Sequence, residues 1–286
     1  MIMYDIAVKA VSECYPCLRR LVHQAAGLAT DDGELKAEAI REGLKVVDEN
    51  FSADVITITI ATEIHQLVKE ITANPDPYRT VKDEEIRISQ ELISEVSPAY
   101  PRDFKGYLAL SALGNVIDFF RDFDTIRGDM RSQVEFLIDD SDRFERKLRK
   151  AKGVLFLADN AGEVFFDLPL LKWMALFAPV TYVVKGSPVQ DDTTIEDLRL
   201  AGLEGELDRV ITTGCATPGV LLHLASDEFK QEFATADLIL AKGMGYYEAL
   251  SEFPGDGRIL YSLMAKCQPV ADSLGVPLKS YVAMLR

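Results

Sequence analysis

The chain has 286 residues, of which 48% are hydrophobic and 27% charged, a composition typical of folded globular proteins and not of disordered ones. Its net charge of −15 argues against a nucleic-acid partner, because phosphate backbones attract basic surfaces. No apolar run approaches the roughly 18 to 20 residues that cross a bilayer, and no basic region precedes an apolar stretch at the N-terminus, so we expect a cytoplasmic protein without a membrane partner.

The first 150 residues are predicted to form a helical N-terminal domain. Apolar side chains recur there at three- and four-residue spacings, with prolines and polar turns between the periodic segments. The predicted helices cover residues 15–29, 34–48, 61–72, 81–96, 104–123 and 131–150. The β-branched segment 54–60 is the strand candidate in this part.

From residue 151 to residue 286 the pattern changes to strand–helix alternation. Short apolar runs are separated by amphipathic segments of helix length. The predicted strands cover residues 154–158, 180–184, 209–212, 238–241 and 259–263. Continuously apolar strands in this alternation are typical of a parallel sheet buried on both faces, so we predict an α/β domain over residues 151–286.

Polar, glycine and lysine residues follow every predicted strand. Ligands of an open parallel sheet bind outside the carboxyl ends of its strands, so these residues are the candidates for a site. In chain order they are Asp159, Asn160, Glu163, Asp192, Gly214, Lys242, Gly243, Met244, Gly245 and Lys266.

The chemistry of these residues indicates a metal ion and a phosphate group. Asp159, Asn160 and Asp192 offer oxygen ligands that suit Mg²⁺ or Mn²⁺. Lys242 and Lys266 could hold a phosphate, and the glycines would let backbone N–H groups approach an anion. The simpler alternatives stay open: an Asp-Asn pair after a strand is as often a helix N-cap, and a lysine at a strand end is usually solvated.

Several motifs along nearly the whole chain point to one family. They are Cys14-Tyr15-Pro16-Cys17, the 114–118 segment with Asn115 and Asp118, Asp159-Asn160-Ala161-Gly162-Glu163, Lys185-Gly186-Ser187-Pro188 with 191–194, the 242–248 segment, and Lys266-Cys267. In this combination the chain resembles the damage-control phosphatases, metal-dependent enzymes once described as a domain of unknown function. The CxxC motif resembles that of the prokaryotic branch.

The resemblance implies a three-layer α/β/α sandwich with a mainly parallel, Rossmann-like sheet behind a helical N-terminal domain. It implies a divalent metal (Mn, Co, Ni or Mg) and hydrolysis of phosphate monoesters of small metabolites, such as sugar, cofactor or damaged metabolite phosphates. It also implies that Asp159, Asn160 and Asp192 bind the metal, that Lys266 holds the phosphate, and that residues 242–248 contact the substrate. Asp192 is preferred over Asp191 as the ligand because of its place after the Lys-Gly-x-Pro motif.

Three further site residues are assigned without a fixed role. Glu163 is expected to act as a base or to support the metal ligands, and Gly214 to offer its backbone N–H to the substrate. Asn115 either covers the metal pocket from the helical side or is solvated at the surface. Ala161 occupies the place where an aspartyl-phosphate enzyme usually carries a second Asp, which favours direct attack by water that the metal activates.

Three roles are open for the N-terminal cysteines: a structural zinc site, redox sensing, or packing. Cys14 and Cys17 are half of a structural zinc site, which Cys215 and Cys267 could complete only if the fold brings the N-terminus over the strand ends. They could instead serve redox sensing or plain packing. The three histidines fit no ligand spacing and are expected in structural positions.

Two rival functions are weighed against the phosphatase. A nucleotide- or S-adenosylmethionine-dependent transferase would share the sheet architecture, but it predicts an acidic residue after the second strand, where Lys185 stands. A non-catalytic metal- or redox-sensing protein would be built around Cys14 and Cys17. The expected partner is a small phosphorylated metabolite, and the sequence leaves a homo-oligomer open.

Overall fold

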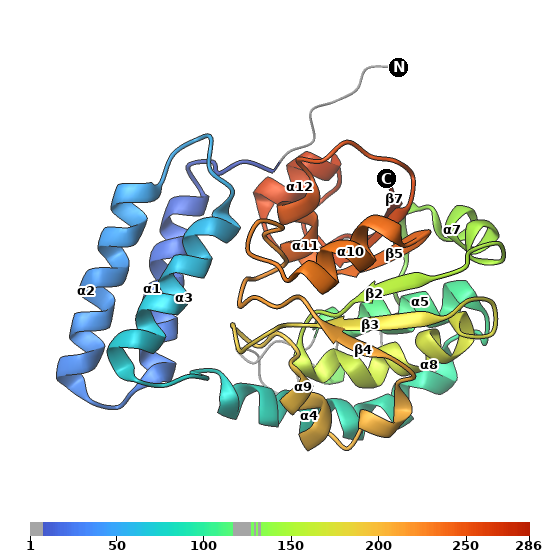
Figure 1. Cartoon of the computed structure of the whole chain (residues 1–286), viewed down its shortest axis with the longest axis horizontal. Coiled ribbons are helices and arrows are strands. Elements are labelled where there is room, and N and C mark those ends of the chain that lie inside the picture. Colours follow the sequence, from blue (N-terminus) through green and yellow to red (C-terminus); the bar gives the residue numbers. More distant parts are fainter. Residues whose placement is uncertain (1–7, 117–126, 129, 131–132) are drawn as a thin grey trace.

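The computed structural model describes residues 8–116, 127–128, 130 and 133–286 (Figure 1). The end of the helix predicted over residues 104–123, and with it Asp118, lies outside the described residues. Among the described residues, no helix is both long and apolar enough to span a membrane.

The N-terminal part is helical, as predicted. Its elements are α1 (Cys14–Ala29), α2 (Gly33–Asn50), α3 (Thr57–Thr72), α4 (Arg79–Val96), η1 (Ser97–Ala99), α5 (Phe104–Leu113) and η2 (Gly114–Val116). Helices α1, α2 and α3 pack around a core of their own that includes Val22, Val47 and Ile64. Helix α2 begins where the Asp32 carboxylate accepts hydrogen bonds from the backbone N–H groups of Glu34 and Leu35.

Two local predictions in this part are wrong. The strand candidate over residues 54–60 contains the start of α3, in which Ile60, Ile64 and Val68 bury their side chains at the four-residue spacing of a helix. The helix predicted over residues 131–150 is interrupted: strand β1 (Phe136–Asp139) precedes helix α7 (Ser141–Leu148). In β1 partly buried and exposed side chains alternate, and the short run lacks the continuous apolar character of the other strands.

The sheet has seven strands in the described part of the chain, in the order β1-β7-β6-β5-β2-β3-β4. They are β1, β2 (Val154–Leu157), β3 (Val180–Val184), β4 (Val210–Thr212), β5 (Leu238–Lys242), β6 (Ile259–Met264) and β7 (Tyr281–Leu285). All neighbours pair in parallel except β6 and β7, which are antiparallel. The strands predicted from sequence are confirmed, and β1 and β7 extend the sheet beyond them.

Helices cover both faces of the sheet, so the predicted three-layer α/β/α sandwich is confirmed (Figure 1). Val154 and Phe156 of β2 point to one face, where α4, α5, α7, α8 (Val164–Met174) and α9 (Ile195–Leu200) pack. Leu155 and Leu157 point to the other, where α10 (Asp227–Thr235), α11 (Gly243–Leu250) and α12 (Gln268–Leu274) pack. The division into two domains at residue 150 stays a prediction.

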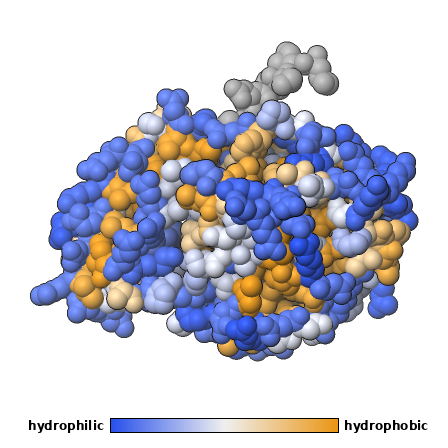
Figure 2. Space-filling model, viewed as in Figure 1, coloured by the Kyte–Doolittle hydropathy of each residue, from blue (hydrophilic) through white to orange (hydrophobic). Residues whose placement is uncertain are grey.

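The surface is mainly hydrophilic in the view of Figure 2. On the face that Figure 2 shows, hydrophilic residues cover most of the molecule, and apolar residues appear in patches over both the α1–α3 helices and the sheet layers. The short turns η3 (Ala161–Glu163) and η4 (Glu204–Glu206) complete the regular elements of the described residues.

Candidate functional site

A cavity of about 290 Å³ lies at the carboxyl ends of the parallel strands. Many of the residues singled out from sequence line it: Asn115, Asp159, Asn160, Asp192, Met244, Gly245 and Lys266. They come from η2 and from the segments that follow β2, β3, β5 and β6. The topology therefore gathers side chains that are up to about 150 residues apart in the chain, as the strand-end rule predicts.

Hydrogen bonds between two loops hold Asp159, Asn160 and Asp192 together. The backbone N–H and the hydroxyl of Thr193 both donate to the Asp159 carbonyl, each at 2.9 Å. Asn160 and Asp192 form an isolated antiparallel bridge. The loops after β2 and β3 are thus paired like a short ribbon, which makes the three side chains neighbours.

The simple helix-cap reading of the Asp-Asn pair does not describe this turn. Asn160 precedes η3, yet its side chain makes no capping hydrogen bond. The Asp159 carboxylate instead lies against the backbone of Gly243, where an added Cβ would stand 1.9 Å from Asp159 Oδ2. Gly243 also has a φ of +77°, so two independent features favour glycine at the start of α11.

The two buried carboxylates disfavour each other's charge. Burial, followed by the charge of Asp192, raises the pKa of Asp159 to about 7. Burial also raises the pKa of Asp192 to about 6, although the Lys185 ammonium opposes the rise. Lys185 Nζ lies 3.3 Å from Asp192 Oδ2, and no group in the described part of the chain makes a well-formed hydrogen bond to that oxygen.

These features fit a hard divalent cation. A cation between the carboxylates would offset their repulsion and would satisfy the Asp192 oxygen. The described residues contain no group of three or more His, Cys, Asp or Glu side chains arranged around a metal position. The candidate set of Asp159, Asn160 and Asp192 supplies two carboxylates and one amide, so water and substrate oxygens would complete the coordination, as Mg²⁺ sites often require.

Lys185 is a buried cation that sequence reasoning assigned no role. Its ammonium donates to the carbonyl of Gly219 and lies 4.2 Å from the centre of the Tyr246 ring. Together with the contact to Asp192 Oδ2, these interactions fix Lys185 beneath the cavity. Its place directly after an apolar strand was the available signal, because a lysine there is either solvated or paired with a buried acid.

Lys242 does not line the cavity. It is fully buried, and its ammonium donates to the Ser111 carbonyl at 2.8 Å and to Asp167 Oδ1 at 2.7 Å. Glu163 Oε2 is its third neighbour, at 2.8 Å. Since an ammonium has three donors, Lys242 has none left for a substrate phosphate. Lys266, in contrast, is exposed and lines the cavity.

Glu163 connects Lys242 to Asn115 within the buried interior. Asn115 Nδ2 lies 2.6 Å and 2.7 Å from the two oxygens of Glu163. A carboxylate accepts hydrogen bonds, so this contact fixes the amide with Oδ1 turned away from Glu163. Burial raises the pKa of Glu163 to about 7 against the opposing charge of Lys242. The prediction that Asn115 approaches the pocket from the helical side agrees with its place in the cavity wall.

The glycines have different surroundings. Gly245 lines the cavity. Gly214 does not: its Cα faces Ser226, and its N–H donates to Thr212 Oγ1 at 3.2 Å. Met244 lines the cavity and its sulfur accepts the backbone N–H of Lys266 at 3.2 Å.

Several cavity residues were not anticipated from the sequence. They are Gln24, Tyr78, Val81, Gln190 and Pro218. Gln24 lies in α1, Tyr78 precedes α4, and Val81 lies in α4. No local motif marks these three residues, because helices that pack over a sheet edge show only the apolar spacing of any buried helix.

The N-terminal cysteines lie near Cys267. Burial raises the pKa of the Cys267 thiol to about 11, and Glu248, Cys14 and Cys17 add to the rise. All these thiols are free, and Cys215 instead contacts the Thr217 hydroxyl at 3.4 Å. In the chain as described, no metal-binding group of three includes them. A four-cysteine zinc site therefore gains no support.

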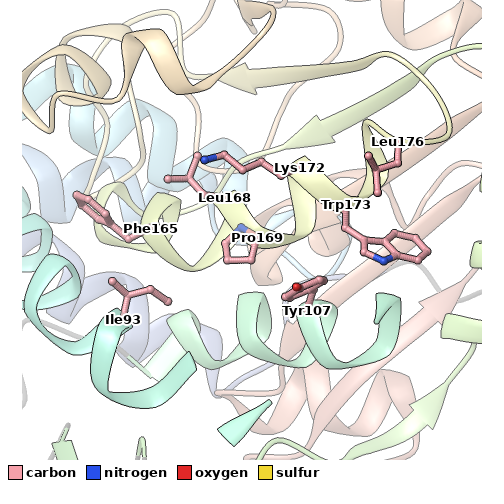
Figure 3. A pocket seen from close by; sticks show the side chains of 8 residues that line it. All are labelled: Ile93, Tyr107, Phe165, Leu168, Pro169, Lys172, Trp173 and Leu176. Atoms are coloured by element: carbon pink, nitrogen blue, oxygen red, sulfur yellow. The ribbon is translucent and has the colours of Figure 1, made fainter. Parts of the chain in front are cut away.

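A larger cleft of about 540 Å³ lies elsewhere, between α4, α5 and α8 (Figure 3). Its lining is mainly apolar and includes Tyr107, Phe165 and Trp173. Lys172, the charged residue in this lining, pairs with Glu206 at 2.6 Å. The cleft lacks the convergent polar groups of the strand-end cavity, so it is the weaker candidate for a site of chemistry.

Comparisons with known proteins find relatives that cover nearly the whole chain. A family model described as the damage-control phosphatase ARMT1-like domain matches residues 10–282. A damage-control phosphatase of Archaeoglobus fulgidus is 36% identical over 290 residues, covering 94% of this chain and 96% of the relative. An uncharacterized protein of Methanocaldococcus jannaschii is 33% identical over 300 residues, covering 98% and 96%. A crystal structure of a DUF89 family protein from Pyrococcus horikoshii superposes with a TM-score of 0.87 at 30% identity, covering 97% of this chain and 99% of that one.

Proposed function

The chain belongs to the damage-control phosphatase ARMT1-like family, and from that premise we propose that it hydrolyses phosphate monoesters of small metabolites with a divalent cation at the strand-end cavity. The observation that carries the proposal is the pair of buried carboxylates, Asp159 and Asp192, beside the exposed ammonium of Lys266 in one cavity. Anionic ligands for a cation and a cation for an anion are the two parts that phosphoryl transfer requires.

Asp159, Asn160 and Asp192 would hold the cation, for which Mn, Co, Ni and Mg are the candidates. When bound, such a cation supplies charge for the phosphoryl oxygens and acidity for a water molecule. Lys185 keeps Asp192 in place from below, since its ammonium is enclosed by Asp192, the Gly219 carbonyl and the Tyr246 ring.

Lys266 would bind the substrate phosphate, because it is exposed and lines the same cavity as the two carboxylates. Gly219 and Gly245 also border the cavity, where their backbones pack against each other so closely that a Cβ on Gly219 would stand 2.2 Å from the Gly245 carbonyl oxygen. We do not assign phosphate binding to Lys242, whose donors are all engaged. No second acid stands two positions after Asp159, which favours attack by water over an aspartyl-phosphate route.

Glu163 is proposed as a positioning residue. Lys242 and Asn115 enclose its carboxylate, and it does not line the cavity. It orients the amide of Asn115, whose oxygen is then free to face the substrate or the cation. A general base would need to reach the attacking water, and Glu163 reaches the cavity only through Asn115.

A metal-dependent activity screen tests the proposal. The purified wild-type protein is incubated with Mn²⁺, Co²⁺, Ni²⁺ or Mg²⁺ and with p-nitrophenyl phosphate, sugar phosphates and cofactor phosphates, and released phosphate is measured. We expect release with at least one metal and its loss with EDTA. Release that is insensitive to EDTA, or no release with any metal, would refute the proposed function.

A further inference from the structure

One wall of the cavity takes no part in the proposed metal site. It consists of Gln24 of α1 and of Tyr78 and Val81 at the start of α4. These residues precede the sheet in sequence. Gln24 belongs to the α1–α3 helices beside the sheet layers, and Tyr78 and Val81 stand at the start of α4, whose later part packs on the sheet (Figure 1). They are therefore candidates to contact the alcohol portion of the phosphate ester.

Tyr78 is held rigidly, but its hydroxyl lacks a partner. The residue is 3% exposed, and its ring packs edge-on against His65 with ring centres 5.7 Å apart. Its hydroxyl is buried, and the described residues offer it no hydrogen bond, although Tyr78 lines the cavity. Leaving a hydroxyl buried and unpaired is unfavourable, so a bound molecule that pairs with it gains affinity from the new hydrogen bond.

The electrostatics of this wall favour an uncharged partner. Burial and the charge of Asp191 raise the pKa of Tyr78 above its usual value, so the phenol stays protonated and can donate as well as accept. Among the described residues that line the cavity, Lys266 is the one cation, and the proposed phosphate position uses it. A second anionic group of a substrate would meet Asp191, Val81 and two neutral polar side chains, which do not stabilise it.

We propose that the Tyr78 hydroxyl, assisted by the Gln24 amide, hydrogen-bonds an uncharged hydroxyl or carbonyl group on the alcohol portion of the phosphate ester. Tyr78 is then a specificity-determining residue that selects polyhydroxylated monoesters over apolar or multiply charged ones. The inference rests on the proposed function, because it concerns the substrate of the same cavity.

A pair of substrates with the same carbon skeleton tests the inference. Glycerol 3-phosphate and propyl phosphate both carry three carbons, but propyl phosphate has no hydroxyl for Tyr78. For each, kcat and KM are measured with the metal-loaded wild-type enzyme and with Tyr78→Phe. Tyr107→Phe is the matched control, because it removes a tyrosine hydroxyl from the apolar cleft of Figure 3.

We expect the wild-type enzyme to prefer glycerol 3-phosphate by about tenfold or more in kcat/KM, as expected for one hydrogen bond to an otherwise unpaired buried group. Tyr78→Phe should reduce the preference to about twofold, mainly through KM for glycerol 3-phosphate, while its melting temperature stays equal or rises. Tyr107→Phe should keep the wild-type preference.

The possible outcomes distinguish a failure of the inference about Tyr78 from a failure of the proposed phosphatase function. If the wild-type enzyme hydrolyses both esters without preferring glycerol 3-phosphate, the inference is wrong and the proposed function stands. The same holds if Tyr78→Phe leaves the preference unchanged or lowers both activities equally. If the wild-type enzyme hydrolyses other esters of the metal-dependent screen but neither of these two, the inference is also wrong and the proposed function stands. If it releases phosphate from no ester with any divalent metal, the proposed function is wrong, and the inference is overturned with it.

Discussion

Asp159 and Asp192 are buried acids whose pKa values rise because burial disfavours their charges, with a further rise from the charge of Asp192 at Asp159 and from the charge of Asp191 at Asp192. A fold selected for stability alone would separate or solvate them, since an uncompensated buried charge costs several kcal/mol. Lys185 compensates one of the pair. The charge of the other carboxylate, Asp159, is the strongest local reason to place a cation in the cavity.

Gly243→Ala tests how closely the site is built around Asp159. The new methyl group would stand 1.9 Å from Asp159 Oδ2, and the φ of +77° is unfavourable for alanine. We expect metal-dependent phosphate release to fall at least about tenfold, because the carboxylate must move, and stability to fall by about 1–2 kcal/mol. Phosphate release and urea unfolding measure the two effects.

Gly202→Ala is the matched control for that substitution. Gly202 has a similar φ of +72°, but nothing lies within 4 Å of its added Cβ. It should lose similar stability and keep its activity. Wild-type activity in Gly243→Ala would show that the Asp159 position does not matter for turnover.

His65 makes stability depend on pH. Burial lowers its pKa from 6.5 to about 3, so between these values the native state binds fewer protons than the unfolded chain. Its contribution is therefore complete above pH 6.5 and is lost as the pH falls. From pH 7 to pH 5 we expect the free energy of unfolding to fall by about 2 kcal/mol more in the wild-type protein than in His65→Phe. Urea unfolding at both pH values measures this; equal losses in the two proteins would disprove it.

At the scale of elements, a buried ion cluster joins the start of α4 to α9. Asp197 is 1% exposed and accepts hydrogen bonds from Arg79 Nη1 at 2.6 Å and Lys82 Nζ at 3.1 Å. The same carboxylate closes the capping box of α9 with Thr194. The cluster therefore holds the segment that carries Tyr78 and Val81 against the sheet.

Asp197→Ala should destabilise the protein by about 3–5 kcal/mol, because it leaves the fully buried Lys82 with only part of its countercharge and removes the acceptor half of the capping box. Asp83→Ala is the control: Asp83 also pairs with Arg79, at 2.6 Å, but at the surface, and should cost less than about 1 kcal/mol. Urea unfolding measures the loss of stability in both variants. Equally small losses would show that the ion cluster does not stabilise the contact between α4 and α9.

The sequence predicted the elements whose patterns are local and missed those that depend on distant pairing. The Asp32 cap and the apolar spacing after it predict helix α2, and a continuously apolar run predicts strand β2. Strand β1 lies at the sheet edge with alternating burial, and its neighbour β7 comes from the other end of the chain. Neither a periodicity nor a turn signal encodes that pairing.

At the scale of the whole molecule, the cavity combines parts of the chain that no local pattern connects. The strand-end rule predicted that Asp159, Asn160, Asp192 and Lys266 would lie close together, because parallel strands share one carboxyl edge. It could not predict Tyr78, which reaches the cavity through the packing of helices. It also could not predict that Lys242 turns into the interior, because a long side chain at a strand end can follow either direction.

The central claim is that Asp159 and Asp192 bind the cation that supports phosphate release. The most direct measurement is Mn²⁺ binding by calorimetry, together with phosphate release, for the wild-type protein, Asp159→Asn, Asp192→Asn and the neighbouring control Asp191→Asn. We predict that Asp159→Asn and Asp192→Asn stay folded and lose both binding and release by about 100-fold or more, while Asp191→Asn keeps both. Wild-type metal binding and phosphate release in Asp159→Asn or Asp192→Asn would contradict the account.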